Sequence, residues 1–257
     1  MSPASGRVPA SRTVVTRGDV AESAGSAGLG AWAALALLGM AAGGRGGAPL
    51  WLDHGLLTWA VGHRPETALA VARGVTDTGT GAVPYVLAVL AGVVAGRTAR
   101  QRLGATALCL VCLGLGQLVR YGVMELVHRP RPPRDDWAAH ASGWAFPSGH
   151  TSTAALAAGL LVLALTLRAP RAGTALRIAV ACWGLSVGLT RIYLGVHWFT
   201  DVVGGWLFAA GWLGACLCAA ACLLPASFLT RTTDPAALPT EDHAPEDPGG
   251  RGRSRPA

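Results

Sequence analysis

Long apolar runs separated by short polar segments constrain this chain more than any other feature. Most of these runs approach the roughly 17 to 25 residues that a helix needs to cross the hydrocarbon core of a bilayer. The chain of 257 residues is 51% hydrophobic and only 14% charged, with a mean hydropathy of +0.41, so the bilayer is its expected solvent. We therefore predict an all-α integral membrane bundle of about six transmembrane helices, with spans at about residues 29–44, 80–96, 103–123, 151–167, 176–190 and 202–224.

Polar segments surround this predicted core. Residues 1–27 are rich in Ser, Gly, Arg and Thr, and residues 226–257 are rich in Pro, Asp, Glu, Gly and Arg. Neither segment can bury enough apolar area to fold, so both are expected to be disordered tails of a transmembrane domain that covers residues 28–225. Residues 53–78 mix apolar side chains with charges, which suits a helix near the membrane interface better than a seventh crossing.

Arginines gather in the segments on one side of the predicted spans. They precede the first span and occupy the loops between spans two and three and between spans four and five: Arg7, Arg12, Arg17, Arg97, Arg100, Arg102, Arg168, Arg171 and Arg177. Because short cytoplasmic loops carry an excess of basic residues, these loops and both termini are expected in the cytoplasm, with the remaining loops facing outward from the plasma membrane. This topology accounts for the net charge of +7. The arginines form no basic stripe along a helix, so nucleic acid is not an expected partner.

The cysteines and several tryptophans are expected to serve packing and anchoring. All six cysteines lie inside apolar runs, where they behave as small buried hydrophobes, so no disulfide framework is predicted. Cys109 and Cys112 have the spacing of a redox motif, but no strand pattern lies beside them. Interfacial anchors are expected at Trp137, Trp144 and Trp198.

Three segments at the predicted outer ends of spans carry unusual polar residues. They are Arg129-Pro130-Arg131-Pro132, Pro147-Ser148-Gly149-His150, and Thr190-Arg191 with His197 and Asp201. Singly, they read as a loop, a helix start and an ordinary i,i+4 pair. Together they supply arginines that can fork onto phosphate oxygens, a hydroxyl and N–H groups at a helix start, and two histidines. Since ionisable residues at membrane depth are costly, this combination indicates a phosphate site with its own acid and nucleophile.

These segments resemble the tripartite signature of the type 2 phosphatidic acid phosphatase superfamily, over about residues 120–205. The last element of that signature is Ser-Arg, five residues, His, three residues and Asp; here Thr190 replaces the serine and keeps the hydroxyl. A lysine that the family normally has seven residues before Arg131 is replaced by Met124. Arg120, one helical turn earlier on the same face, is the candidate to take its place.

The resemblance implies a role for each matching residue. His197 resembles the nucleophile that forms a phosphohistidine, and Asp201 would accept its Nδ1 proton. His150 resembles the general acid that protonates the leaving group and then activates water. No metal and no cofactor are needed in this scheme. The residues expected to bind the phosphoryl oxygens are Arg131, Ser148, Gly149, Arg191 and Arg120.

The function implied by the resemblance is that of a membrane phosphatase. Its substrate would be a phosphomonoester or pyrophosphate of a lipid, such as a polyprenyl pyrophosphate like undecaprenyl pyrophosphate, phosphatidic acid or phosphatidylglycerol phosphate. One alternative is a lipid phosphotransferase, because another acceptor can capture the same phosphohistidine. A second is a catalytically weak membrane scaffold or transporter-like protein, which explains the spans but not the ordered motifs. Membrane lipids are the expected partners, and the sequence leaves the oligomeric state and the substrate open.

Overall fold

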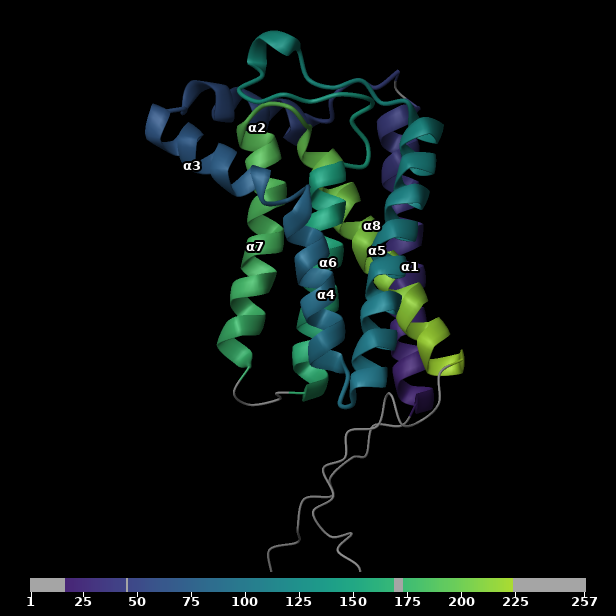
Figure 1. Cartoon of the computed structure of the whole chain (residues 1–257). Helices are drawn as coiled ribbons and strands as arrows, with labels where there is room; N and C mark the ends of the chain where they lie inside the picture. Colours follow the sequence, from purple (N-terminus) through teal and green to yellow (C-terminus); the bar gives the residue numbers. More distant parts are fainter. Residues whose placement is uncertain (1–16, 45, 169–172, 224–257) are drawn as a thin grey trace, which may run out of the picture.

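The fold was obtained as a computed structural model, and it describes residues 17–44, 46–168 and 173–223. These residues form helices joined by turns and loops, with no strand among them. Six long helices run side by side as a bundle (Figure 1): α1 (Arg17–Gly43), α4 (Ala82–Ala95), α5 (Ala99–Val127), α6 (Gly149–Arg168), α7 (Thr174–Tyr193) and α8 (Phe199–Leu223). The predicted all-α membrane bundle is therefore confirmed.

Five of these helices are long and apolar enough to cross a membrane, and α4 is the exception. At 14 residues, α4 is about 21 Å long, which is shorter than the roughly 30 Å of a bilayer core. It passes the same test only together with the preceding helix α3 (Glu66–Asp77), from which it is bent by 51°. The described residues thus contain five candidate membrane spans, or six if this bent pair forms one crossing.

The predicted interfacial segment consists of two helices, α2 (Trp51–Gly62) and α3, which lie across one end of the bundle (Figure 1). Pro65 caps the start of α3 with a φ of −63°. Proline disfavours helical backbone at the residue before it, Arg64, so α2 cannot continue unbroken into α3. The sequence pattern predicted a single helix in this region. The structure has two helices there, at one end of the bundle.

The first helix begins earlier than composition suggested, because residues 17–27 are helical and not part of a disordered tail. The cause is close packing of small residues against α8: a Cβ on Gly28 would lie only 3.3 Å from the Cα of Gly214. Such contacts let two backbones approach, and they outweigh the weak helix propensity of glycine and serine. Residues 1–16 and the predicted tail at 226–257 lie outside the described residues.

Helix α6 is the centre of the bundle and carries one of the three motifs at its first turn. More than half of its apolar window is buried, 61%, whereas the other candidate spans bury at most 28% of theirs. Small side chains allow its neighbours to come close, since a Cβ on Gly184 of α7 would lie 3.0 Å from the Cβ of Ala158. The start of α6 is consequently held in place by packing along the whole helix.

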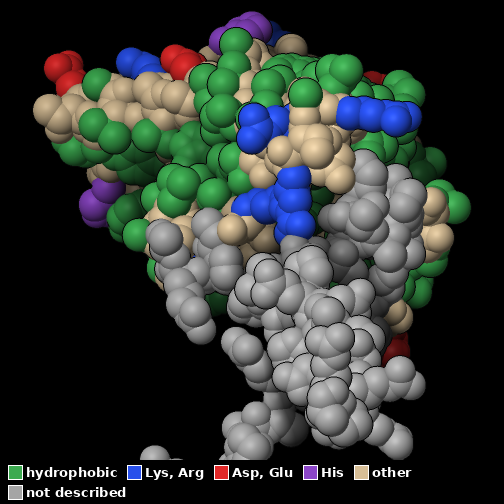
Figure 2. Space-filling model, turned by 60° about the horizontal axis from the view of Figure 1, so that its bottom comes forward, with side chains coloured by type: hydrophobic (Ala, Val, Ile, Leu, Met, Phe, Trp, Pro, Cys, Tyr) green, Lys and Arg blue, Asp and Glu red, His purple; other side chains and the backbone are tan. Residues whose placement is uncertain are grey.

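The motifs and the arginine-rich loops lie at opposite ends of the bundle. The motif-bearing ends of α5, α6, α7 and α8 meet under α2, α3 and the loop over 128–148 (Figure 1). The other end, which Figure 2 brings forward, carries blue arginine side chains. Among the arginines of the α4–α5 connection, Arg97, Arg100 and Arg102 are exposed. The α4–α5 connection therefore lies at the end of the bundle opposite the motifs, as the arginines along the sequence predicted.

Candidate active site

The turn between α7 and α8 places His197 and Asp201 together. Gly195 in this turn has a φ of +71°, and a Cβ there would collide with the carbonyl oxygen of Asp136. His197 is buried, and its Nδ1 lies 3.4 Å from Oδ2 of Asp201 in the first turn of α8. At this distance the contact is electrostatic, since Nδ1 makes no hydrogen bond. The backbone N–H of Trp198 donates to the same Oδ2 at 2.8 Å and helps to fix the carboxylate.

The tautomer of His197 follows from its other ring nitrogen. Nε2 lies 2.8 Å from Nη1 of Arg131. A guanidinium group can only donate hydrogen bonds, so Nε2 must be the acceptor and carry a lone pair. The ring proton of the neutral histidine is then on Nδ1, which faces Asp201. A nucleophilic histidine needs this arrangement, with the lone pair on the outer nitrogen.

Burial also keeps the imidazole unprotonated. Removal from solvent lowers the pKa of His197 well below its ordinary value of 6.5, and the positive charges of Arg131 and Arg191 act in the same direction. Protonation would occupy Nε2 and remove the lone pair. The site therefore favours the neutral form of His197 at neutral pH.

The second motif is tied directly to the third. Ser148 is fully buried, and its backbone N–H donates to the carbonyl of Asp201 at 3.0 Å. Its hydroxyl accepts a hydrogen bond from Thr151 at 2.9 Å, which leaves its own proton free to donate. Gly149 and His150 follow as the first residues of α6, where unpaired N–H groups and the helix dipole favour an anion.

Three buried or half-buried arginines surround the two histidines. The charges of Arg191, Arg131 and Arg120 all act on the ring of His150, and His150 in turn acts on His197. Burial lowers the pKa of Arg131 to about 10, so that this group stays charged at neutral pH. The three sequence motifs thus come together as one positively charged site.

Each arginine is held by a different part of the fold. Arg131 donates to the carbonyl groups of Ser142, Gly143, Trp144 and Val196 at 2.7–3.2 Å, so the surrounding loop fixes its guanidinium. Arg191 of α7 donates to Thr76 of α3 at 3.0 Å, while its Nε is buried without a partner. An anion beside Arg191 would supply that missing acceptor.

Arg120, the candidate to replace the family lysine, lies beside Met124 and the start of α6. It is buried on α5, with Nη1 3.7 Å from Sδ of Met124. A Cβ on Gly149 would be 3.4 Å from its Cζ, so the guanidinium borders the start of α6. Gln117 accepts a hydrogen bond from Nε at 3.1 Å and steadies the side chain.

Two residues of this region were not assigned a role from the sequence. Arg129 entered only as part of a motif, yet it is fully buried and pairs with Asp53 and Asp201 at 2.6 Å each. Asp53 is also fully buried, on α2. The only signal in the sequence was a carboxylate within the otherwise apolar run Trp-Leu-Asp-His-Gly-Leu-Leu.

Trp198 is a packing residue and not the interfacial anchor that was expected. It is only 6% exposed, and its Nε1 donates to the carbonyl of Pro130 at 3.0 Å. The guanidinium of Arg129 lies 5.8 Å from the centre of its ring, close enough for a cation–π contact. Its position next to His197 in the sequence, on a buried turn, overrides the usual preference of tryptophan for the interface.

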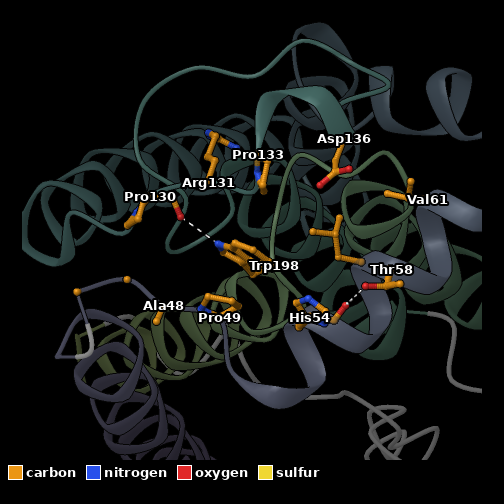
Figure 3. Close-up of a pocket in the computed structure, with 13 residues that line it drawn as sticks. Ala48, Pro49, His54, Thr58, Val61, Pro130, Arg131, Pro133, Asp136 and Trp198 are labelled. Atoms are coloured by element: carbon orange, nitrogen blue, oxygen red, sulfur yellow. Dashed lines mark hydrogen bonds between the residues drawn. The ribbon is translucent and has the colours of Figure 1, made fainter.

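A cavity of about 650 Å³ adjoins the site beneath the loop that carries Arg131. Figure 3 shows it between α2, the segment before α2, and the loop over 130–136. Its walls are mainly apolar, with prolines and Trp198 on one side and Leu57 and Val61 of α2 on the other. In the described residues, no three His, Cys, Asp or Glu side chains gather as they would around a metal ion.

The fold and the site define a multi-pass helical membrane protein with a positively charged, histidine-containing site at one end. Residues 104–222 match the model of the PAP2 superfamily. Phosphatidylglycerophosphatase B of Bacillus subtilis (strain 168) is 31% identical over 140 residues, 52% of this chain and 66% of that protein. Phosphatidylglycerophosphatase B of Escherichia coli (strain K12) is 36% identical over 88 residues, 34% of this chain and 33% of that protein.

A solved structure is similar over a longer stretch. The crystal structure of the first transmembrane PAP2 type phosphatidylglycerolphosphate phosphatase from Bacillus subtilis has a TM-score of 0.61 and 25% identity. The similarity covers 76% of this chain and 94% of that one, whereas the sequence matches span about two thirds and one third of the two curated relatives. This chain belongs to the PAP2 superfamily, as its three motifs indicated.

Proposed function

We propose that this protein is a membrane phosphatase that releases phosphate from a lipid-linked substrate through a phosphohistidine on His197. The observation that carries the proposal is the contact between Nη1 of Arg131 and Nε2 of His197 at 2.8 Å. It puts a lone pair on a buried imidazole next to the positive charge of Arg131, which attracts a phosphoryl group.

In the first half of the reaction, the lone pair of Nε2 attacks phosphorus. The bond from phosphorus to the leaving oxygen breaks, its electron pair stays on that oxygen, and His150, which enters this step as an imidazolium beside the negative charge of the substrate, supplies the proton. Asp201 faces the Nδ1 proton and stabilises the positive charge that the ring acquires. Arg131, Arg191 and the N–H groups at the start of α6 stabilise the negative charge that develops on the phosphoryl oxygens.

The second half returns the site to its starting state. His150 takes a proton from water, and the water oxygen attacks phosphorus. The bond from phosphorus to Nε2 breaks, and its electron pair returns to the ring as the lone pair. Every step uses side chains of this chain alone, so the proposed reaction needs no metal ion.

We propose phosphatidylglycerophosphate as the first substrate to consider, because the curated relatives and the similar solved structure are phosphatases of that lipid by name. Polyprenyl pyrophosphates and phosphatidic acid present the same terminal phosphoryl group. The cavity beside Arg131 offers mainly apolar walls to the part of the substrate next to its phosphate.

The expected result with purified protein in detergent is release of free phosphate from phosphatidylglycerophosphate in the presence of a chelator. Phosphatidic acid and undecaprenyl pyrophosphate, tested in parallel, would rank the lipids by kcat/KM. Loss of release on chelation would refute the metal-free scheme. Phosphate found on an acceptor lipid, with none released, would make the protein a phosphotransferase.

Arg120 is expected to replace the missing lysine in phosphate binding. Arg120→Ala should lower kcat/KM roughly ten- to a hundredfold, the range for loss of one charged hydrogen bond of about 1.5 to 3 kcal/mol. Met124→Lys should then bring little gain, because the guanidinium already lies 3.7 Å from Sδ of Met124. Arg134→Ala is the matched control, since Arg134 is exposed in the adjacent loop. If neither Arg120→Ala nor Met124→Lys changes kcat/KM, Arg120 lies outside the working site.

We also propose that the protein lies in the plasma membrane, with the site facing outward and the arginine-rich loops facing the cytoplasm. In intact cells, a cysteine in place of the exposed Asp135 should react with an impermeant thiol reagent, whereas one in place of the exposed Arg100 should not. The wild-type protein, with its six native cysteines, gives the background. The opposite labelling pattern would put the site in the cytoplasm.

A further inference from the structure

A buried ion network lies behind His197, on the side away from Arg131. Arg129 donates from Nη1 to Oδ1 of Asp201 and from Nη2 to Oδ2 of Asp53, both at 2.6 Å. All three side chains are completely buried. Burying charges is costly even when they are paired, and here two carboxylates share one guanidinium, so chain stability alone does not account for the network.

Thr200 closes the network. Its hydroxyl accepts from Nη1 of Arg129 at 2.6 Å and donates to Asp53, and its backbone N–H donates to Oδ1 of Asp53 at 2.8 Å. Asp53 also accepts from the N–H of Leu50 at 3.0 Å. Through these contacts α2 is docked onto the first turn of α8, where Asp201 faces His197.

The charges of this network do not cancel. Two carboxylates share one guanidinium, so the network carries one excess negative charge when both carboxylates are ionised. If Arg129 paired with Asp201 alone, it would neutralise that carboxylate. Because Asp53 takes one half of the guanidinium fork, Arg129 does not neutralise Asp201 alone, and the ionised network as a whole keeps one negative charge on the Nδ1 side of His197.

We propose that Asp53 and Arg129 are positioning residues that fix the orientation and the negative charge of Asp201, and through it the protonation of His197. This inference rests on the proposed role of His197 as nucleophile. It gives α2 a part in the reaction, although α2 carries none of the three sequence motifs.

His197 also faces charged groups from the other elements around it. Arg131 approaches from the loop after α5, Arg191 from α7 and His150 from α6, and all three disfavour protonation of its ring. Asp201 approaches from α8 at 3.4 Å. The network behind Asp201 is thus the negative counterpart to the arginines on the phosphate side.

The test compares three variants with wild-type protein by the pH profile of kcat/KM, whose acid limb reports protonation of the free enzyme. Asp53→Asn keeps the size of the side chain but removes the excess negative charge. It should lower kcat about ten- to a hundredfold with KM unchanged, as for other groups that orient a catalytic residue. Protonation of His197 becomes less favourable, so the acid limb should move to lower pH. Ionisation of the substrate affects the acid limb of all variants equally, so differences between the variants come from the protein.

Asp53→Asn combined with Arg129→Met removes one charge of each sign and restores the excess negative charge on Asp201. Its acid limb should return toward the wild-type position, although kcat stays low because the carboxylate has lost its partner. Thr200→Val is the matched control: it removes hydroxyl hydrogen bonds from the same cluster without a change of charge, and its acid limb should not move. A network with a merely structural role would give the double variant a larger defect and no return of the profile.

An unmoved acid limb in Asp53→Asn, or the same shift in Thr200→Val, would overturn the inference. If Asp53→Asn does not fold, Asp53→Ser takes its place, because it also removes the carboxylate and should move the acid limb in the same direction. Full activity of a His197→Ala variant would instead remove the proposed function itself. If His197→Ala abolishes turnover while kcat and the acid limb of Asp53→Asn stay at their wild-type values, only the proposed role of the network is refuted.

Discussion

His197→Ala should abolish phosphate release, with a loss of at least about a thousandfold in kcat. The physical reason is that Nε2 of His197, next to Arg131, supplies the lone pair that attacks phosphorus in the proposed reaction. Steady-state phosphate release from a lipid phosphate in detergent measures the effect. The variant should still insert and fold, since the ring makes no hydrogen bond from Nδ1 and Arg131 keeps its four backbone acceptors.

His140→Ala is the matched control, because His140 is an exposed histidine of the loop above the site. It should release phosphate like the wild-type protein. Phosphate release by His197→Ala at the wild-type rate would remove the covalent mechanism.

His150→Ala is expected to show the second largest effect, a loss of about a hundred- to ten-thousandfold, which is the usual contribution of a general acid and base. The proposed role makes this loss depend on the leaving group. With a lipid phosphate the leaving oxygen must be protonated, and the first step should fail. With p-nitrophenyl phosphate the leaving group needs little help, so the first step should survive.

The second step should still fail, because no residue then activates water. The variant is therefore expected to release nitrophenol in a burst of about one equivalent and to stall as phosphoenzyme. Rapid mixing with optical detection measures the burst. Equal losses for both substrates, without a burst, would show that His150 is not the acid.

The sequence predicted most of the membrane bundle, and the structure brings the predicted site residues together; both have simple causes. Apolar runs long enough to cross a bilayer leave the chain few alternatives to helices. The motif residues lie at the ends of these runs, so bundling of the helices was enough to bring His150, Arg131 and His197 together. Arg120 followed from helical geometry alone, since it lies one turn from Met124 on the same helix.

Other features depend on contacts between distant parts of the chain and could not be read locally. Asp53 meets Thr200 across 147 residues of sequence, and neither residue belongs to a pattern that predicts the contact. Trp198 looked like an interfacial anchor because its burial comes from contacts with Arg129 and Pro130, which lie far from it in the sequence. The helical state of residues 17–27 depends on α8, whose glycines allow close approach.

The phosphoenzyme itself gives the most direct test of the central proposal. Purified protein is mixed briefly with a lipid phosphate labelled in its terminal phosphoryl group, quenched in alkali and digested, and the labelled peptide is sequenced by mass spectrometry. The proposal predicts alkali-stable, acid-labile phosphate on His197, with more of it in His150→Ala. Label on Ser148 or on another residue, or turnover with no labelled protein at any time, would contradict it.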